Sequence, residues 1–95
     1  MKSQVLLIDD IRNFPDVTKV ARTFDEGITA LKSQHWDCLY LDHDLGEIDG
    51  KDGTGIMNFL EENPQFLPKQ IIIVSSNPVG RQRMKIIIEK LYRKA

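Results

Sequence analysis

The sequence predicts a small α/β domain built on a parallel sheet of four strands. Four short apolar runs, each the length of a strand, alternate with helical patterns, and this alternation is typical of βαβ units. The runs are apolar at nearly every position, which indicates strands covered on both faces of the sheet. The 95 residues have room for one hydrophobic core, so we expect a single domain over residues 1–95.

The first half of the chain contains two predicted strands and one helix. Residues 4–9 form the first strand, and the following stretch, 10–16, is too broken by asparagine and proline for a full helix. Residues 17–22 are weakly apolar and suit a strand at the edge of the sheet. A capping box then begins at Thr23 and predicts a helix over 24–34.

The second half contains two strands and two helices. Residues 38–42 form the third strand, and the glycine-rich stretch 46–55 is interpreted as a mobile loop. A helix is expected over 55–63, ending before a proline because the residue ahead of proline resists helical backbone angles. The β-branched run 70–75 predicts the fourth strand. A helix that begins at Pro78 completes the pattern.

These elements favour a doubly wound sheet with strands in the order 2-1-3-4 and three main helices, which is a truncated flavodoxin-like topology. Strands one and three are then neighbours at the centre of the sheet. The fourth strand becomes a strongly apolar edge, and natural proteins seldom leave such an edge free. We therefore expect a homodimer formed through the fourth strand.

The composition limits the classes of partner. Hydrophobic residues make up 41%, charged residues 28%, and the net charge is −1, which are ordinary values for a globular domain. The basic side chains near the C-terminus are interpreted as a solvated helix face, with an RNA-facing rim as the alternative. Sequence-specific DNA binding is not expected. The first apolar run is too short for a signal peptide or a membrane span, so we expect a cytoplasmic protein without a membrane partner.

Carboxylates stand at the ends of two strands that the predicted order makes neighbours. Asp9 and Asp10 follow the first strand, and Asp42 ends the third. Ligands of open parallel sheets bind beyond the carboxyl ends of the strands, and hard oxygen ligands suit a divalent metal such as Mg²⁺. The alternative is that these acids cap helix starts and face solvent. The three aspartates are therefore a candidate metal site.

The run Asp42-His43-Asp44 holds the candidate catalytic residues. His43 is the side chain best suited to proton transfer near neutral pH, and its flanking carboxylates would hold the ring in one tautomer. The structural alternatives are a histidine bonded to a local carboxylate within the turn, and an Asp44 that bonds the turn amides before Gly46.

Candidate phosphate-binding residues end or follow three of the strands. Arg12 and Arg22 can each fork onto a phosphate or pair with the acids. Ser75, Ser76 and Asn77 offer hydroxyl, amide and helix N-terminal donors that can bind an anion. Their structural alternative is capping of the final helix, which does not exclude phosphate binding.

Several short motifs together resemble a known family. They are Ile-Asp-Asp-x-Arg at 8–12, Arg-Thr-x-x-Glu at 22–26, Leu-Asp-His-Asp-Leu-Gly at 41–46, Thr-Gly at 54–55 and Ser-x-Asn-Pro-x-Gly at 75–80. The acidic pair, the third-strand aspartate and the fourth-strand hydroxyl resemble the receiver superfamily of two-component signalling. The full set resembles its cyclic-phosphate processing branch over nearly the whole chain, and Asp-His-Asp-Leu-Gly is the most specific piece.

The resemblance implies a phosphoesterase lineage associated with RNA repair and with phage or bacterial conflict systems. By position it implies site roles for Asp9, Asp10, Arg12, Asp42, His43, Asp44, Ser75 and Asn77. Val74 stands where family members often have a histidine, so the resemblance does not imply a mechanism with two histidines. The chain also lacks the fifth strand and phosphate-binding lysine of ordinary receivers.

Three functional hypotheses follow from the sequence. The first is a phosphoesterase-like domain that acts on or binds cyclic-phosphate nucleotides or RNA ends, with a divalent metal, magnesium, held by the acids. The second is a receiver-type domain with Asp42 as phosphoacceptor, working as a signalling module. The third is a ligand-sensing or scaffolding module without turnover.

Overall fold

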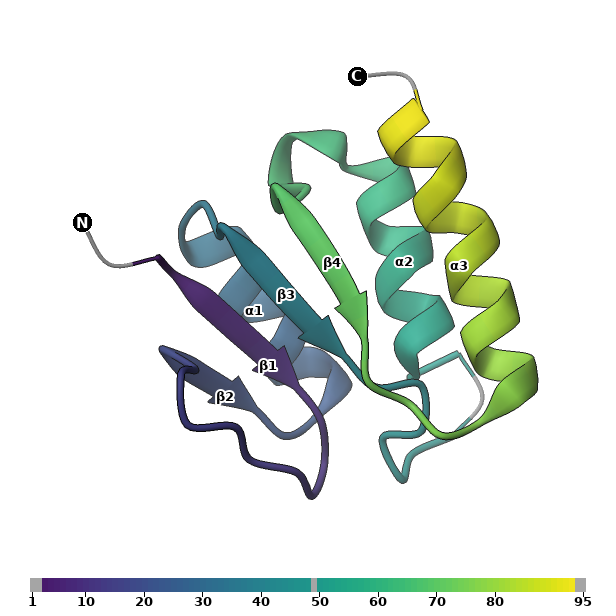
Figure 1. Ribbon diagram of the computed structural model, residues 1–95, viewed down its shortest axis with the longest axis horizontal. Helices are drawn as coiled ribbons and strands as arrows, with labels where there is room; N and C mark the ends of the chain where they lie inside the picture. The colour runs from purple at the N-terminus through teal and green to yellow at the C-terminus, as the bar shows by residue number, and fades with distance from the viewer. Residues whose placement is uncertain (1–2, 49, 94–95) are drawn as a thin grey trace.

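The computed structural model describes residues 3–48 and 50–93 and contains a four-stranded parallel sheet with three helices and one short 3₁₀ turn (Figure 1). The elements in chain order are β1 (Val5–Ile8), β2 (Lys19–Ala21), α1 (Phe24–Ser33), β3 (Cys38–Leu41), α2 (Gly53–Glu62), η1 (Pro64–Phe66), β4 (Gln70–Ile73) and α3 (Pro78–Arg93). The sheet order is β2-β1-β3-β4. The α/β fold predicted from the sequence, with its strand order 2-1-3-4, is therefore confirmed.

The strands align in register at the centre of the sheet. β1 pairs with β3 from Val5 opposite Cys38 to Ile8 opposite Leu41, and both pairings of β1 are parallel. The ladders are shorter than the apolar runs suggested. The segment predicted as a strand over 17–22 is a strand only at Lys19–Ala21, because only those residues pair with β1.

All three helices pack on one face of the sheet. One core cluster joins Leu6, Leu39 and Ile71, which share a face of the sheet, to buried residues of α1, α2 and α3 such as Leu31, Met57 and Met84. Figure 1 shows α1 behind β1 and β3, and α2 lies between α1 and α3 in contact with both. Right-handed crossovers explain this layer, because the steps from β2 to β3 and from β3 to β4 move across the sheet in the same direction.

The opposite face of the sheet is covered unevenly. Leu7 of β1 is fully buried, and the ring of Phe14 in the β1–β2 connection packs on Tyr40 with centroids 5.3 Å apart. Ile72 of β4 points to the same side and is 38% exposed. The expectation of strands covered on both faces therefore holds for β1 and is wrong for β4, because the β1–β2 connection, whose Phe14 packs on this face, contains no helix.

Side-chain caps fix where the helices begin. The hydroxyl of Thr23 accepts from the amide of Glu26 at 3.1 Å, so the predicted cap at Thr23 is confirmed. The carboxylate of Glu26 also reaches back, but it accepts from the amide of Arg22, the residue before the cap, rather than from Thr23. α2 begins at Gly53, two residues before the predicted start, because Asp52 is its N-cap and accepts from Gly55 N at 2.9 Å. The predicted loop 46–55 is shorter for the same reason, and Asp49 within it lies outside the described residues.

Within residues 3–48 and 50–93, every helix is too short or too polar to cross a bilayer. β4 is one of the two edge strands of the sheet, as expected. The homodimer through this strand stays a prediction.

Candidate functional site

Asp9 and Asp42 lie side by side at the carboxyl ends of β1 and β3. The register continues past the strands, because the amide of Asp42 donates to Ile8 O at 3.0 Å. One carboxylate oxygen from each of Asp9, Asp10 and Asp42 lies within 4.8 Å of the others. The strand ends also form a pocket of about 250 Å³, which we call the strand-end pocket. Its lining residues are Asp9, Asp10, Ile11, Arg12, Asp42, Asp44 and Ser76.

Asp9 is fully buried and well supplied with hydrogen-bond donors. Its Oδ1 accepts from the amides of Ile11 and Arg12, each at 2.9 Å, and its Oδ2 accepts from Arg12 Nη1 at 3.1 Å. Burial alone would raise the pKa of this carboxyl, but the two amides and the guanidinium outweigh burial and lower it. Asp9 is therefore held ionised.

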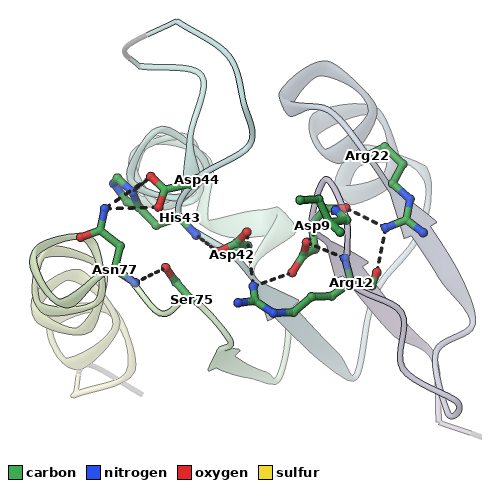
Figure 2. Close-up of polar contacts among 9 residues, drawn as sticks. Asp9, Arg12, Arg22, Asp42, His43, Asp44, Ser75 and Asn77 are labelled. Atoms are coloured by element: carbon green, nitrogen blue, oxygen red, sulfur yellow. Dashed lines mark hydrogen bonds and ion pairs between the residues drawn. The ribbon is translucent and has the colours of Figure 1, made fainter.

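The guanidinium of Arg12 lies between two of the acids (Figure 2). Its Nη1 is 3.1 Å from Asp9 Oδ2 and 3.5 Å from Asp42 Oδ2. The second oxygen of Asp42 accepts from the amide of His43 at 2.8 Å. Three of the four carboxylate oxygens of Asp9 and Asp42 thus accept hydrogen bonds within the chain, and the fourth, Asp42 Oδ2, forms an ion pair with Arg12. Arg12 stands where a cation shared by these two acids would lie.

Asp42 has the opposite pKa shift to Asp9. Burial raises the pKa of Asp42, and the negative charge of Asp9 raises it further, against the opposing effects of Arg12, the His43 amide and Ser75. The ionised form is therefore less favourable here than in water. Perturbed carboxyls of this kind gather at functional sites.

Arg22 does not line the strand-end pocket. Its Nη1 donates to two backbone carbonyls, Asp9 O at 3.2 Å and Arg12 O at 2.7 Å, and its Nη2 donates to the side chain of Asn13. The sequence placed Arg22 among the phosphate ligands. In the structure it braces the turn that carries Arg12.

The ring of His43 also lies outside the pocket lining. Its side chain is only 13% exposed, with Nδ1 3.0 Å from Asp44 Oδ1 and Nε2 3.9 Å from Asp52 Oδ2. The ring packs against the first turn of α3 at Gly80, where an added Cβ would lie 2.6 Å from His43 Cδ2. The histidine therefore fills the junction between α2 and α3, as in the structural alternative of a turn bonded to a local carboxylate.

Asp44 and Asn77 connect β3 to the start of α3. Asp44 is exposed and lines the pocket, and its bond to His43 lowers its pKa, with a further contribution from Asn77. Asn77 Nδ2 lies 3.3 Å from Asp44 Oδ2, while Asn77 Oδ1 accepts from Gly80 N at 3.1 Å as the cap of α3. Both functional groups of the Asn77 side chain are thus engaged within the chain.

The two serines differ in their access to the pocket. Ser75 is 4% exposed, and its hydroxyl accepts from the amide of Asn77 at 3.0 Å. Ser76 is exposed and lines the pocket. Of the predicted phosphate-binding residues, Arg12 and Ser76 therefore line the pocket. Arg22, Ser75 and Asn77 do not line it, and they form hydrogen bonds that hold the neighbouring turns.

Sequence reasoning missed three residues that shape the site. Gly53 lies against the backbone of the 42–44 segment, where an added Cβ would be 2.8 Å from His43 Cα, and Gly80 lies equally close to the His43 ring. Asp52 caps α2 and faces His43. A signal for Asp52 was present, because an aspartate before a Gly-Thr-Gly run is a good N-cap candidate. Gly80 ends the Ser-x-Asn-Pro-x-Gly motif and Gly53 belongs to the glycine-rich stretch 46–55, but neither pattern indicated a close approach to His43.

The parallel order β2-β1-β3-β4, with acids at the carboxyl ends of the central strands, defines a receiver-like α/β domain. The chain belongs to the family described as cyclic-phosphate processing receiver domain, which matches residues 4–90.

Among solved structures, a sulfate-bound mutant of the response regulator MaeR is similar over 100% of both chains, with a TM-score of 0.64 and 14% identity. At that identity the similarity supports the fold alone. None of the curated proteins matches the chain.

Proposed function

We propose that the domain binds the phosphate of a cyclic-phosphate nucleotide or RNA end in the strand-end pocket and opens the ring as a phosphoesterase. The observation that carries the proposal is the position of Arg12 between the carboxylates of Asp9 and Asp42, on the pocket surface. Its remaining N–H groups can fork onto phosphoryl oxygens. The family to which the chain belongs supports the same class of ligand.

Ser76 offers a second contact for the phosphate. It lines the pocket just ahead of α3, and the N-terminus of a helix favours an anion through its free amides and its dipole. The proposal places the phosphoryl group between Arg12 and Ser76, with the ribose directed toward solvent.

Ring opening requires two proton transfers. Water attacks phosphorus and loses a proton, one ring P–O bond breaks, and the leaving ribose oxygen takes up a proton. Asp42 lines the pocket and has a raised pKa, so it is the carboxyl best suited to accept the proton from water and to return it to the leaving oxygen. His43 acts through Asp44 as a positioning residue, because its ring does not line the pocket.

The charge of the pocket supports the sequence-based proposal of a magnesium cofactor. Four carboxylates and one guanidinium line it, so an anionic phosphate needs additional positive charge. The oxygens of Asp9, Asp10 and Asp42 are close enough together to hold one divalent cation, which would neutralise charge and polarise the phosphate. Arg12 uses oxygens of Asp9 and Asp42 and would have to release them.

A second candidate function is that of a phosphoacceptor. Asp42 follows β3 of a receiver-like sheet beside Asp9 and Asp10, an arrangement that resembles that of signalling receivers. In that case Asp42 would be labelled by acetyl phosphate in the presence of magnesium, and cyclic phosphates would not be turned over.

The decisive experiment is a turnover assay on 2′,3′-cyclic nucleotides, 3′,5′-cyclic nucleotides and RNA with a cyclic-phosphate end, each with magnesium or with EDTA. Wild type should open at least one substrate, and Asp42→Asn should lose activity while remaining folded. Asp25→Asn is the matched control, since Asp25 is an exposed aspartate that pairs with Lys51 outside the pocket. Equal activity of the three proteins would exclude the catalytic proposal, and labelling of Asp42 without turnover would favour the phosphoacceptor.

A further inference from the structure

β4 has one free side along its length. It stands last in the sheet and pairs with β3 alone, and α3 contacts it. The amide of Val74 donates to Leu41 O of β3 at 3.0 Å. Peptide groups alternate between the two sides of a strand in a parallel sheet, so Ile71 and Ile73 direct their N–H and C=O groups to the free side.

This edge lacks the usual protection against strand pairing. Natural edge strands are blunted by charged residues, by proline or by a covering element, but β4 reads Gln-Ile-Ile-Ile. Ile72 is 38% exposed, and Ile73 is half-buried at the free side. An open apolar edge of this kind is a template for an added strand.

A groove runs between the end of β4 and the adjacent face of α3. It has a volume of about 320 Å³, and we call it the β4–α3 groove. Its lining residues are Ile73, Ser76, Pro78, Arg81, Gln82 and Lys85. Ile73 at the end of β4 thus lies on one side of the groove, and polar and basic residues of α3 lie on the other.

Both charged side chains that line the groove, Arg81 and Lys85, are basic. Arg81 and Lys85 are one helical turn apart on α3, and both are exposed. In the part of the chain that the structure describes, neither forms an ion pair, whereas Lys90 on the same helix pairs with Glu61 at 2.9 Å. An occupant that brings carboxylates to this wall would supply the missing partners.

We propose that the β4–α3 groove binds an extended, acidic peptide segment of another protein, which adds a strand to β4 and pairs its carboxylates with Arg81 and Lys85. Main-chain hydrogen bonds to the free side of β4 supply affinity, and the two basic side chains supply selectivity. This inference goes beyond the proposed function and does not depend on it, because the groove is lined by a different set of residues apart from Ser76.

A second copy of this chain would not supply the missing carboxylates. Antiparallel pairing of two β4 edges about a two-fold axis would place the two grooves, each at the carboxyl end of its own strand, at opposite ends of the joined strands. The strand that each copy adds would read Gln-Ile-Ile-Ile, which contains no acid to pair with Arg81 and Lys85. Nucleic acid would use the basic side chains but not the free peptide groups of β4.

The test uses a synthetic decapeptide of alternating valine and glutamate, with an alternating valine and lysine decapeptide as its control. Binding is measured by fluorescence anisotropy, and the contact site by amide chemical shifts and hydrogen exchange of the ¹⁵N-labelled domain. The acidic peptide should protect the amides of Ile71 and Ile73. Arg81→Glu and Lys85→Glu should each weaken binding about tenfold or more, while Arg83→Glu, on α3 but outside the groove, should not.

Several outcomes would overturn the proposal. Equal binding of the two peptides, no binding, or an unchanged affinity in both charge-reversal variants would each exclude an acidic strand. A concentration-dependent dimer in sedimentation velocity that the acidic peptide fails to dissociate would assign the edge to a second copy. Preferential binding of a single-stranded RNA, lost in the same variants, would assign the basic wall to nucleic acid.

Discussion

Replacing Gly80 by alanine tests whether the ring of His43 is clamped against α3. A Cβ at this position would lie 2.6 Å from His43 Cδ2 and 2.7 Å from Nδ1, well inside ordinary van der Waals contact. The ring cannot withdraw freely, because it lies between Asp44 and Asp52. The substitution therefore forces the histidine and the first turn of α3 apart.

Two effects of opposite sign set the size of the change. Exchanging glycine for alanine inside a helix stabilises by about 1 kcal/mol when the site is open. Forcing an extra carbon into a packed site costs about 1–3 kcal/mol. With a clash of this depth we expect Gly80→Ala to lower the free energy of unfolding by about 1–2 kcal/mol. For a domain of this size that loss lowers the melting temperature by about 4–8 °C per kcal/mol.

The assay is chemical denaturation of a double-mutant cycle with His43→Ala. In that background the imidazole is gone, so Gly80→Ala should become stabilising by about 1 kcal/mol, and the sign of the effect should reverse. Val79→Ala, at the exposed neighbouring position, is the control and should change stability by less than about 0.5 kcal/mol. A stabilising Gly80→Ala in the wild type, or an equal cost in both backgrounds, would refute the clamp.

Three other predictions concern charge and pH. Burial raises the pKa of Asp42 above that of an aspartate in the unfolded chain. The contribution of Asp42 to the free energy of unfolding is therefore lost as pH rises through the folded-state pKa, because the carboxyl must ionise in an unfavourable site. Asp42→Asn, which cannot ionise, should melt at a higher temperature than wild type at pH 7. A lower melting temperature would contradict this. Arg12→Met removes the guanidinium that pairs with the carboxylates of Asp9 and Asp42. Titration calorimetry should therefore show that this variant binds Mg²⁺ about tenfold more tightly than wild type, because the cation no longer competes with Arg12. The control Arg83→Met should bind Mg²⁺ as wild type does. Burial raises the pKa of Tyr92 to about 12, so wild type should lose stability as pH rises from about 10 toward 12. Denaturation at several pH values should show a smaller loss in Tyr92→Phe.

The convergence of the acids was predictable because it follows from topology. An apolar run that ends in Asp9-Asp10 and another that ends in Asp42 become neighbours once the strand order 2-1-3-4 is inferred. That inference needs only the periodicity of the sequence and the handedness of the crossovers. The Thr23 cap of α1 and the proline at the start of α3 are equally local, and the structure confirms them.

The roles of individual polar side chains were less predictable. Arg12 and Arg22 are equivalent in the sequence as cations near the acids, but the structure places Arg12 on the carboxylates and Arg22 on backbone carbonyls. His43 was equally suited to catalysis and to turn structure. In the structure the His43 ring lies against Gly80 of α3 and faces Asp52, the N-cap of α2. These contacts join residues far apart in the chain, so no local sequence pattern predicts them.

The sequence alone determined the α/β class, the order of the strands and the edge of the sheet at which the aspartates meet, because backbone propensity, hydrophobic period and crossover handedness are properties of short segments. Only the tertiary structure decided which side chains face the strand-end pocket and which brace it. It also decided that all three helices share one face, leaving Ile72 of β4 exposed on the other. These features depend on packing between residues far apart in the chain. At such contacts a glycine or the rotamer of one side chain determines how closely two elements approach, and short sequence patterns do not record this distance.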